Sequence, residues 1–548
     1  MTGSRVLVVG LDGATWDVIF PLMEQGKLPN LQYLVRGGSF GYLNSTTPPM
    51  TLPSWSSMLT GCNPGKHGIF DFVHKKQNQW NLEFTNSTFR EVPTIHQIIS
   101  KQGGRVVSVA VPTTWPPQEL NGIVISGFDS PVSTGIDRTF CYPQNIYDEI
   151  HRKFGGMCFA DFQESRIDHD WHTFAKKSLL KEIERKEKIA QWILQKERWD
   201  MFMFLFGESD TVSHHFWRFY DSKSPRFDGS SAELSTAIPD VYCALDKMLG
   251  AVIESANPEY ICLCSDHGFG GAGTHAVYLN RYLEETGWLQ YKRRAVFSPV
   301  LDMSKMGFSK YVPSSVQGKI YRIVPNFIIN KMESSSRFGN IKMSKTKFVS
   351  DEMNYAATLR SNHINAEFSS EIFGQLQHDL LRWEVDGQPV IKKIYRREDI
   401  YWGDFVHRSP EIILELHERE GYTYTMLPSI RSNQSWRLLH PHEYSGGKGL
   451  GMNGTHRQHG VFLIYGGDIP SVQIEHMDMW DIAPTLLYAL DAEIPSYMDG
   501  TIKIPLDPTR PSKYTDQFDR WNQQNTTEEF NTKQNEELRR RLEKLGYL

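Results

Sequence analysis

Seven side chains of this sequence combine ligand types that bind divalent metals with a hydroxyl that could act as a nucleophile. They lie beside short apolar runs and a proline-rich stretch: Asp12, Asp210, His214, Asp266, His267, His456 and Thr51. Carboxylates and imidazoles without thiolates suit Zn²⁺ or Mn²⁺. Two such ions about 4 Å apart can hold a phosphoryl group and stabilise its attacking and leaving oxygens. The chemistry that this set predicts is phosphoryl transfer to a threonine hydroxyl.

Each of these residues also has an ordinary structural explanation. Asp12 precedes a glycine and a helix-like segment, so it could cap that helix. Asp210 and His214 could form an exposed turn, and His456 could be a hydrogen-bonded loop histidine. A single Asp-His pair is more often such a feature than a metal site. The coincidence of four polar loops at four predicted strand ends is what favours the metal interpretation.

The stretch TTPPMTLPSWSSMLTGCNPGKHGIFDF, residues 46–72, holds two residues that could act as nucleophiles. Thr51 follows the prolines and precedes a helix-like run. Cys62 lies in C-N-P-G-K, which is close to the C-x-P-x-R pattern whose cysteine is oxidised to formylglycine in sulfatases. The choice between them depends on which one occupies the place of the nucleophile.

The elements that must position these residues alternate along the chain. Apolar runs predict buried strands within 5–13, 103–112, 199–210, 260–271 and 460–469, the fourth of which ends in a polar, glycine-rich loop. Helical periodicity is clear at 179–197 and 479–490. This alternation indicates an α/β fold with a mostly parallel central sheet flanked by helices. Ligands of such sheets bind outside the carboxyl ends of the strands, where the seven residues lie.

The pattern also suggests how the chain is divided. We expect residues 1–280 and 440–510 to form the α/β core. Residues 281–440 are expected to contribute an inserted cap segment and a small α/β subdomain, because periodicity is weak from 281 to 345. Residues 511–548 should form a tail that ends in an amphipathic helix.

Composition narrows the class of protein. The chain has 548 residues, of which 40% are hydrophobic and 22% charged, as in globular proteins. A net charge of −5 without a Lys/Arg block does not indicate bulk nucleic acid or an anionic membrane as a partner. There is no secretory signal pattern and no apolar run near the roughly 18 residues of a membrane helix. The six cysteines contain no C-x-x-C, so a cytoplasmic location is the simplest expectation.

The chain resembles the alkaline phosphatase superfamily, and within it the type I phosphodiesterase/nucleotide pyrophosphatase enzymes, including a group described as predicted phosphohydrolases or phosphomutases. Six stretches carry the resemblance in the family's order, between residue 6 and about residue 500: VLVVGLDGATWDVI, TPPMTLPSWSSMLTGCNPGKHGIFDF, GESDTVSHHFW, CSDHGFG, GTHRQHGVFLIYG and DIAPTLLYAL. The resemblance implies an alkaline-phosphatase-like fold, two divalent ions, with Zn²⁺ favoured over Mn²⁺, and a small-molecule phosphate ester or nucleotide-like substrate.

The family pattern implies a role for each of the seven residues. One ion would be held by Asp12, Thr51, Asp266 and His267, and the other by Asp210, His214 and His456. Thr51 would also be the nucleophile, because it stands immediately before the family's hydrophobic-Pro step. His215 and His459 are neighbouring alternatives to His214 and His456.

Substrate contacts follow less clearly from the pattern. In the nucleotide pyrophosphatases an Asn follows that proline and touches the phosphate. Here Ser54 stands instead, and a hydroxyl donates one hydrogen bond where an amide donates two. Lys345 and Lys347 could reach a substrate phosphate or form an exposed charged turn. Four tryptophans could stack on a leaving group, although such aromatics are more often part of the core: Trp16, Trp55, Trp115 and Trp217.

The family pattern also decides between the two nucleophiles. In sulfatases the reactive cysteine occupies the nucleophile place, and a T-G-x-x-P-x-x-H-G stretch follows later. Here TGCNPGKHG is that later stretch, so Cys62 should be a small buried residue. We therefore predict a two-metal phosphohydrolase that cleaves phosphodiester or pyrophosphate bonds through a phosphorylated Thr51. A phosphomonoesterase or phosphomutase is the alternative enzyme, and a metal-stabilised binding protein is the alternative of another class.

Overall fold

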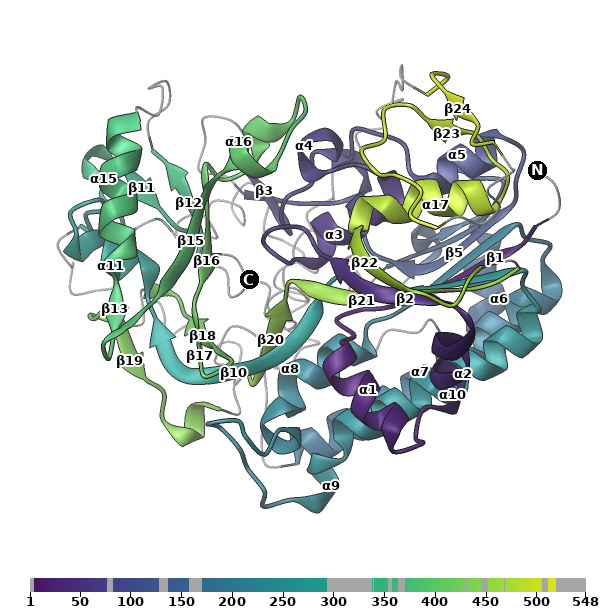
Figure 1. Cartoon of the computed structure of the whole chain (residues 1–548), viewed down its shortest axis with the longest axis horizontal. Coiled ribbons are helices and arrows are strands. Elements are labelled where there is room, and N and C mark those ends of the chain that lie inside the picture. Colours follow the sequence, from purple (N-terminus) through teal and green to yellow (C-terminus); the bar gives the residue numbers. More distant parts are fainter. Residues whose placement is uncertain are drawn as a thin grey trace.

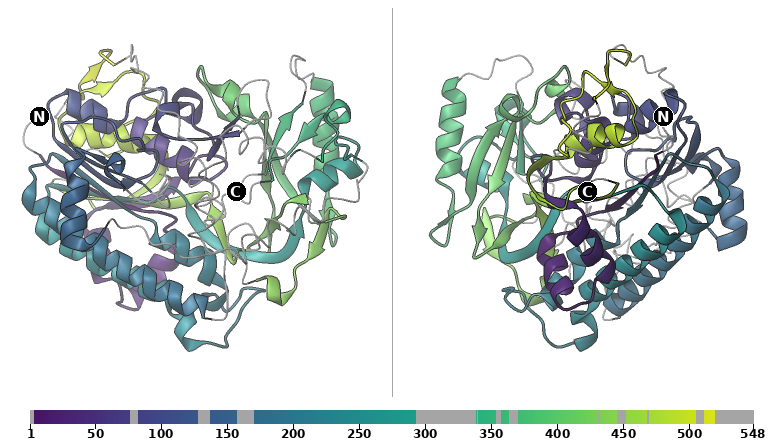
Figure 2. Two further views of the ribbon diagram at one scale, coloured as in Figure 1. Left: turned by 180° about the vertical axis from the view of Figure 1, so that it is seen from behind. Right: turned by 45° about the vertical axis from the view of Figure 1, so that its right-hand side comes forward.

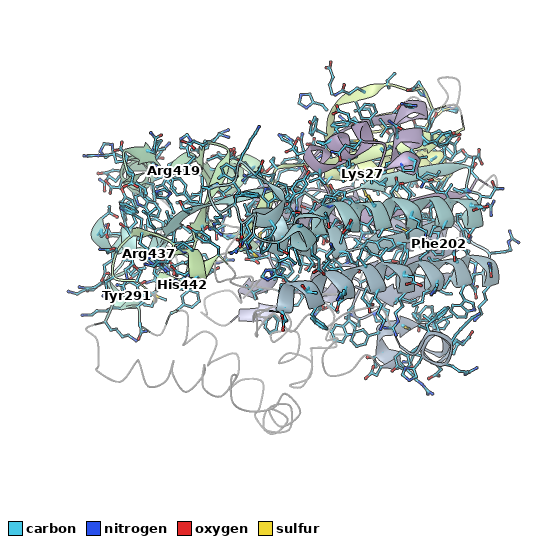
Figure 3. All side chains as sticks on the ribbon, turned by 90° about the horizontal axis from the view of Figure 1, so that it is seen from below. Lys27, Phe202, Tyr291, Arg419, Arg437 and His442 are labelled. Atoms are coloured by element: carbon cyan, nitrogen blue, oxygen red, sulfur yellow. The ribbon has the colours of Figure 1, made fainter. Side chains whose placement is uncertain are left out.

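The protein consists of a large α/β body joined to a smaller region rich in β-structure (Figure 1). The computed structural model describes residues 4–75, 82–127, 137–156, 170–292, 338, 340–352, 357–362, 370–429, 432–444, 452–467, 469–504 and 511–518. Figure 2 shows the same division from behind and from one side. In the view from below, Phe202 marks the larger body, and Arg419 and Arg437 mark the smaller region (Figure 3).

A nine-stranded sheet forms the centre of the larger body. Its order is β22 (Gln473–Asp478), β2 (Ser39–Asn44), β21 (His459–Gly466), β9 (Tyr260–Cys264), β1 (Val6–Leu11), β8 (Met201–Phe206), β5 (Val106–Val111), β6 (Gly122–Ser126) and β7 (Cys141–Tyr142). The run from β9 to β6 is parallel, whereas β21 and β7 pair antiparallel with their neighbours. The predicted α/β fold with a mostly parallel central sheet is confirmed.

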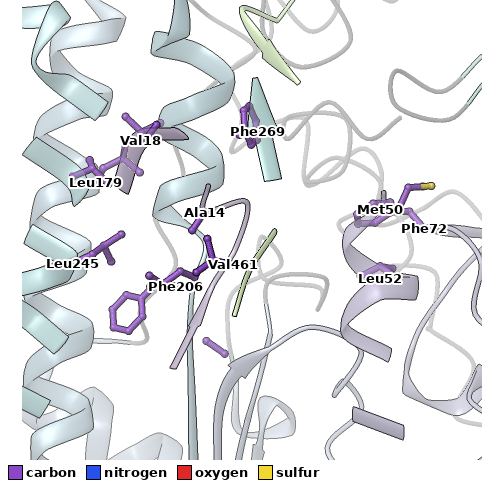
Figure 4. Packing of buried hydrophobic residues seen from close by; sticks show 14 of the residues in the cluster. Ala14, Val18, Met50, Leu52, Phe72, Leu179, Phe206, Leu245, Phe269 and Val461 are labelled. Carbon is purple, nitrogen blue, oxygen red and sulfur yellow. The ribbon is translucent and has the colours of Figure 1, made fainter. Parts of the chain in front are cut away.

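Helices cover both faces of this sheet, which is why its central strands are apolar along their whole length. The helices on one face are α1 (Trp16–Glu24), α2 (Pro29–Gly37), α7 (Trp171–Lys196), α8 (Glu208–Tyr220) and α10 (Ala237–Ala256), and those on the other are α3 (Thr51–Thr60), α5 (Ile95–Lys101) and α17 (Ile482–Ala489). Alternate residues of β1 belong to separate clusters, Leu7 and Val9 to the first and Val8 to the second. Figure 4 shows Val18, Leu179, Phe206 and Leu245, which all belong to the first cluster.

The glycine-rich stretch after β9 is a strand, so the prediction of a loop there was wrong. β10 (Gly268–Val277) pairs with β20 (Gly454–Arg457) at its start and with β18 (Tyr422–Met426) and β19 (Trp436–Leu438) further along. Its glycines permit close packing, because a Cβ at Gly271 would lie 2.8 Å from the Tyr422 ring. β10 thereby connects the larger body to the smaller region (Figure 1).

The smaller region contains a second sheet in the order β11 (Phe348–Val349), β12 (Ala357–Ser361), β16 (Ile412–Leu416) and β15 (Ile391–Arg396). It is accompanied by α11 (Leu279–Glu285), α15 (Ser370–Leu381) and the short α16 (Arg397–Ile400). Most of the expected cap, 293–337, and the expected C-terminal helix, 526–548, lie outside the described residues, so the proposed domain limits stay a prediction. Among the described helices, none is both long and apolar enough to cross a membrane.

A buried ion pair connects two helices of the larger body. Lys186 on α7 and Glu208 at the start of α8 are 4% and 5% exposed. The Lys186 ammonium lies 2.8 Å and 3.0 Å from the two carboxylate oxygens of Glu208. Glu208 stands two residues before Asp210, so this pair fixes the helix start that carries a predicted metal ligand.

We predict that replacing only one partner of this pair is more harmful than replacing both. Lys186→Met leaves the Glu208 carboxylate buried without its counter-ion, and the free energy of unfolding should fall by about 3–5 kcal/mol. The double variant Lys186→Met/Glu208→Gln should lose less, because neither member of the pair is left as an unpaired buried charge. Urea unfolding of the metal-free proteins measures both values. Equal losses in the two variants would contradict the expectation.

Candidate metal centre

The six predicted metal ligands form two adjacent triads. Each triad can offer one ligand atom per residue with all three atoms within 4.8 Å of one another. The first triad is Asp210, His214 and His456, and the second is Asp12, Asp266 and His267. All six side chains are buried. The imidazole rings of His267 and His456 stack at 3.6 Å between centroids, so the triads adjoin.

The fold brings these residues together at the carboxyl ends of three neighbouring strands. Asp12 follows β1, the Asp266-His267 pair follows β9, and Asp210 stands on α8 just after β8. His214 is four residues further along α8, on the same face as Asp210. Gly13 adopts a φ of 63°, and a Cβ there would lie 3.2 Å from the Cα of Asp210. Glycine is therefore needed for the close approach of the loop after β1 to α8.

The ligand atoms of the first triad have the spacing of a metal site. Nε2 of His214 lies 3.1 Å from Oδ1 of Asp210 and 3.1 Å from Nε2 of His456, and that third atom lies 3.4 Å from the same Oδ1. Ligands at about 2.0–2.1 Å from a tetrahedral Zn²⁺ are about 3.3 Å apart, so the three atoms fit one face of such a site.

The second triad is slightly more open. Nε2 of His267 lies 3.2 Å from Oδ2 of Asp266 and 3.8 Å from Oδ1 of Asp12. Within the described residues, neither of these two carboxylate oxygens has a hydrogen-bond donor. Buried carboxylate oxygens without donors fit a site for a divalent cation.

Backbone carbonyls orient all three histidines in the same way. Nδ1 of His214 donates to Gly454 O at 2.9 Å, Nδ1 of His267 donates to Gly268 O at 3.0 Å, and Nδ1 of His456 donates to Pro49 O at 3.0 Å. Because Nδ1 carries the hydrogen in each bond, Nε2 presents its lone pair to the triad. The tautomer that a metal ligand requires is therefore set by the fold.

The electrostatics of the two triads also favour the binding of cations. Burial, together with the charges of Asp266 and Asp210, raises the pKa of Asp12 well above its usual value. Burial raises the pKa of Asp266 to about 8. Burial and the neighbouring His267 lower the pKa of His456 well below its ordinary value. Three crowded carboxylates and three imidazoles whose Nε2 atoms face the triads form a donor set that a pair of divalent ions would stabilise.

Thr51 is the first residue of α3 and is fully buried. Its hydroxyl oxygen has no hydrogen-bond partner among the described residues. The helix and the residues just before it contact one residue of each triad. Trp55 Nε1 donates to Asp12 Oδ2 at 3.2 Å, and Pro49 O accepts a hydrogen bond from His456. Thr51 and Trp55 are four residues apart and share one face of α3. The helix start that carries the hydroxyl is therefore anchored to both triads.

The other predicted contact residues have different surroundings. The Ser54 hydroxyl is hydrogen-bonded to the hydroxyls of Ser45 and Thr46, at 2.8 Å and 2.9 Å. Trp55 is fully buried and contacts Asp12. Lys345 is exposed on η5 (Met343–Lys345) of the smaller region, and among the described residues no hydrogen bond or ion pair joins it to the triads.

The alternatives to the predicted site residues lie outside the triads. His215 is buried with its ring 4.7 Å from that of Trp171, and His459 is exposed. Cys62 is buried, as predicted, and burial raises the pKa of its thiol to about 12. A thiol with so high a pKa is a poor nucleophile near neutral pH.

One supporting residue was missed in the sequence. Asn453 donates its backbone N–H to His214 O at 2.9 Å and its side-chain amide to His215 O at 3.1 Å. It thereby fastens α8 to the strand that carries His456. Its only sequence signal is its position three residues before that histidine.

Comparisons with known proteins agree with this architecture. The sequence pattern described as type I phosphodiesterase / nucleotide pyrophosphatase matches residues 6–437. Human ectonucleotide pyrophosphatase/phosphodiesterase 5 has a similar structure, with a TM-score of 0.50 and 15% identity over 92% of this chain and 99% of that one. Phosphonoacetate hydrolase from Sinorhizobium meliloti 1021, in complex with phosphonoacetate, has a TM-score of 0.52 and 14% identity over 89% and 95%. At such identities the likeness shows a common fold. No curated protein sequence matches the chain.

We predict that His456 and His459, which lie three residues apart, differ in their effect on metal binding. His456→Ala removes one of three ligands, and bound metal should fall from about two ions to about one per chain. His459→Ala, the matched control, should bind as much metal as the unaltered protein. Elemental analysis after dialysis against buffered Zn²⁺ or Mn²⁺ measures both. Unchanged metal content in His456→Ala would refute the assignment of the first triad.

Proposed function

The chain belongs to the type I phosphodiesterase / nucleotide pyrophosphatase family of the alkaline phosphatase superfamily, and we propose that it hydrolyses phosphodiester or pyrophosphate bonds with Thr51 as the nucleophile. The observation that carries the proposal is the buried Thr51 hydroxyl, without a partner among the described residues, at a helix start anchored to two triads that fit divalent ions. A small-molecule phosphate ester or nucleotide-like substrate suits this arrangement.

In this proposal both triads serve to bind divalent metal ions. Asp210, His214 and His456 would hold one ion, and Asp12, Asp266 and His267 would hold the other. The bound ions, of which Zn²⁺ suits the ligands best, act as Lewis acids that neutralise the charge of the phosphoryl oxygens.

The start of α3 supplies the nucleophile and further stabilisation of negative charge. The backbone N–H groups of Thr51 and Leu52 precede the first intrahelical bond, which runs from Ser54 N to Met50 O at 3.1 Å. Among the described residues neither of these two amides donates a hydrogen bond, and anions are favoured at such a helix start. Oγ1 of Thr51 gives up its proton and forms the bond to phosphorus, while the bond from phosphorus to the ester oxygen breaks and that oxygen leaves as an alcohol with a proton. The oxygen of a water molecule then bonds to phosphorus as the bond to Oγ1 breaks, a proton returns to Oγ1, and the remaining phosphate ester leaves.

The charged neighbours of the site support a diester rather than a monoester. A monoester brings an additional negative charge, which a nearby cation normally offsets. Three cations that the sequence places near the motifs have other partners. Lys66 pairs with Asp499 at 2.7 Å, Lys347 lies over the Trp288 ring at 5.1 Å, and Arg457 donates to Gly271 O at 3.2 Å and Gly421 O at 2.9 Å.

The role of Thr51 is tested by three variants. Thr51→Ala should lower the rate of turnover by at least about 1,000-fold, because no other hydroxyl replaces it. Thr51→Ser keeps the hydroxyl and should retain measurable activity. Cys62→Ala is the control and should change the rate little. Loss of activity in Cys62→Ala, with activity kept in Thr51→Ala, would reverse the assignment of the nucleophile.

The class of substrate is tested by comparing two chromogenic esters under the same metal conditions. We expect kcat/KM for bis(p-nitrophenyl) phosphate to exceed that for p-nitrophenyl phosphate by about 10-fold or more, because Lys66, Lys347 and Arg457 have other partners among the described residues. Thr51→Ala should lose both activities. A clear preference for the monoester would instead favour a phosphomonoesterase or phosphomutase.

A further inference from the structure

The segment immediately before Thr51 cannot be held as an ordinary strand. Pro48 and Pro49 have no backbone N–H, so the segment lacks the donors of a strand ladder. After the backbone bond from Ser45 N to Gln458 O, it is held through carbonyl oxygens, chiefly those of residues 45, 47 and 49. Each of these carbonyls accepts a hydrogen bond from a side chain distant in the sequence.

Two of the three donors come from one short stretch beside the metal centre. Gln458 Nε2 donates to Ser45 O at 2.6 Å, and His456 Nδ1 donates to Pro49 O at 3.0 Å. The third donor is the hydroxyl of Tyr401, which donates to Thr47 O from 354 residues away. Tyr401 follows α16 of the smaller region. Of the three donors, it is therefore the one that connects the smaller region to this segment.

Tyr401 is well placed to restrain the segment. Its side chain is 7% exposed, and its ring meets that of Phe70 edge to face at 5.1 Å between centroids. A buried hydroxyl with a single carbonyl partner has little freedom to change its direction. The ring contact holds Tyr401 in place independently of its hydroxyl.

The residues after Tyr401 are docked beyond the far end of α3. The Asn63 side chain accepts from the backbone N–H of Trp402 at 3.2 Å and donates to the Trp402 carbonyl at 3.0 Å. Phe405 N donates to Gly65 O at 2.9 Å. A Cβ at Gly65 would lie 2.4 Å from Trp402 O, so the two backbones are in direct contact. Residues 401–405 therefore form hydrogen bonds with the chain both before and after the helix that begins with Thr51.

We propose that Tyr401 is a positioning residue for Thr51. This proposal rests on the proposed function of Thr51 as the nucleophile. The hydroxyl of Tyr401 fixes Thr47 O, and with it the path of residues 47–50 that sets where Oγ1 of Thr51 lies. The smaller region thus contributes to the reaction through the backbone of the nucleophile loop. Small displacements of a reacting atom reduce rates strongly, so a lost restraint should affect turnover more than substrate binding.

The variant Tyr401→Phe tests this directly, because it keeps the ring packed on Phe70 and removes only the donor. We expect kcat to fall by about 10-fold, with KM and metal content unchanged. Independently of activity, hydrogen–deuterium exchange of the amides in residues 46–52 should become faster. The matched control is Tyr424→Phe, since Tyr424 is also buried and donates to a backbone carbonyl of the smaller region, Pro389 O, at 3.2 Å.

The two proposals fail in distinguishable ways. Unchanged exchange over residues 46–52 in Tyr401→Phe would refute the positioning role, as would an equal fall of kcat in the Tyr401→Phe and Tyr424→Phe proteins. Inactivity of the unaltered, metal-loaded protein towards both chromogenic esters would refute the proposed function. Faster exchange together with a lower kcat in Tyr401→Phe alone would support the positioning role.

Discussion

The burial of three carboxylates at one edge of the central sheet is the constraint on which this structure depends. Asp12, Asp210 and Asp266 are almost completely withdrawn from water. Burial and the charges of Asp266 and Asp210 raise the pKa of Asp12, and burial raises the pKa of Asp266. Such a cluster is costly when it is charged, and divalent cations remove that cost. Divalent ions held by the two triads would therefore stabilise the fold at neutral pH as well as provide a site for chemistry.

The three histidines connect the triads to the backbone through hydrogen bonds. Each imidazole uses Nε2 for its triad and Nδ1 for a backbone carbonyl, so ligand direction and loop conformation are fixed together. The bond from His456 to Pro49 is the most consequential of these, because it joins the first triad to the segment that carries Thr51. Tyr401 adds a restraint on the same segment from the smaller region. β10, which begins directly after His267, joins the two parts of the molecule at the same place.

Much of the sheet could be predicted from hydrophobic periodicity alone. β1, β8 and β9 are continuous apolar runs, which is the pattern of strands buried on both faces. The order of the motifs along the chain predicted that the polar residues lie at the ends of these strands. The glycine-rich strand β10 was not predictable in this way. Glycine favours turns locally, and only the approach of the Tyr422 ring shows why an extended strand needs it here. The hydrogen-bond partners of Trp55 and Ser54 were likewise not predictable, since Asp12 and Ser45 are distant or unpatterned in the sequence.

The sequence by itself determined the fold class, the family and the types of the candidate ligands, because strand-end motifs and apolar periodicity are local and keep their order along the chain. The division of the ligands into two triads was implied by the family resemblance, and tertiary structure decided which atoms face each other. It also decided that Nε2 of each histidine faces inward, that Asn453 supports His214, and that Tyr401 reaches the segment before Thr51. These contacts join residues as far apart as 47 and 401, and only the folded path of the chain brings such residues together.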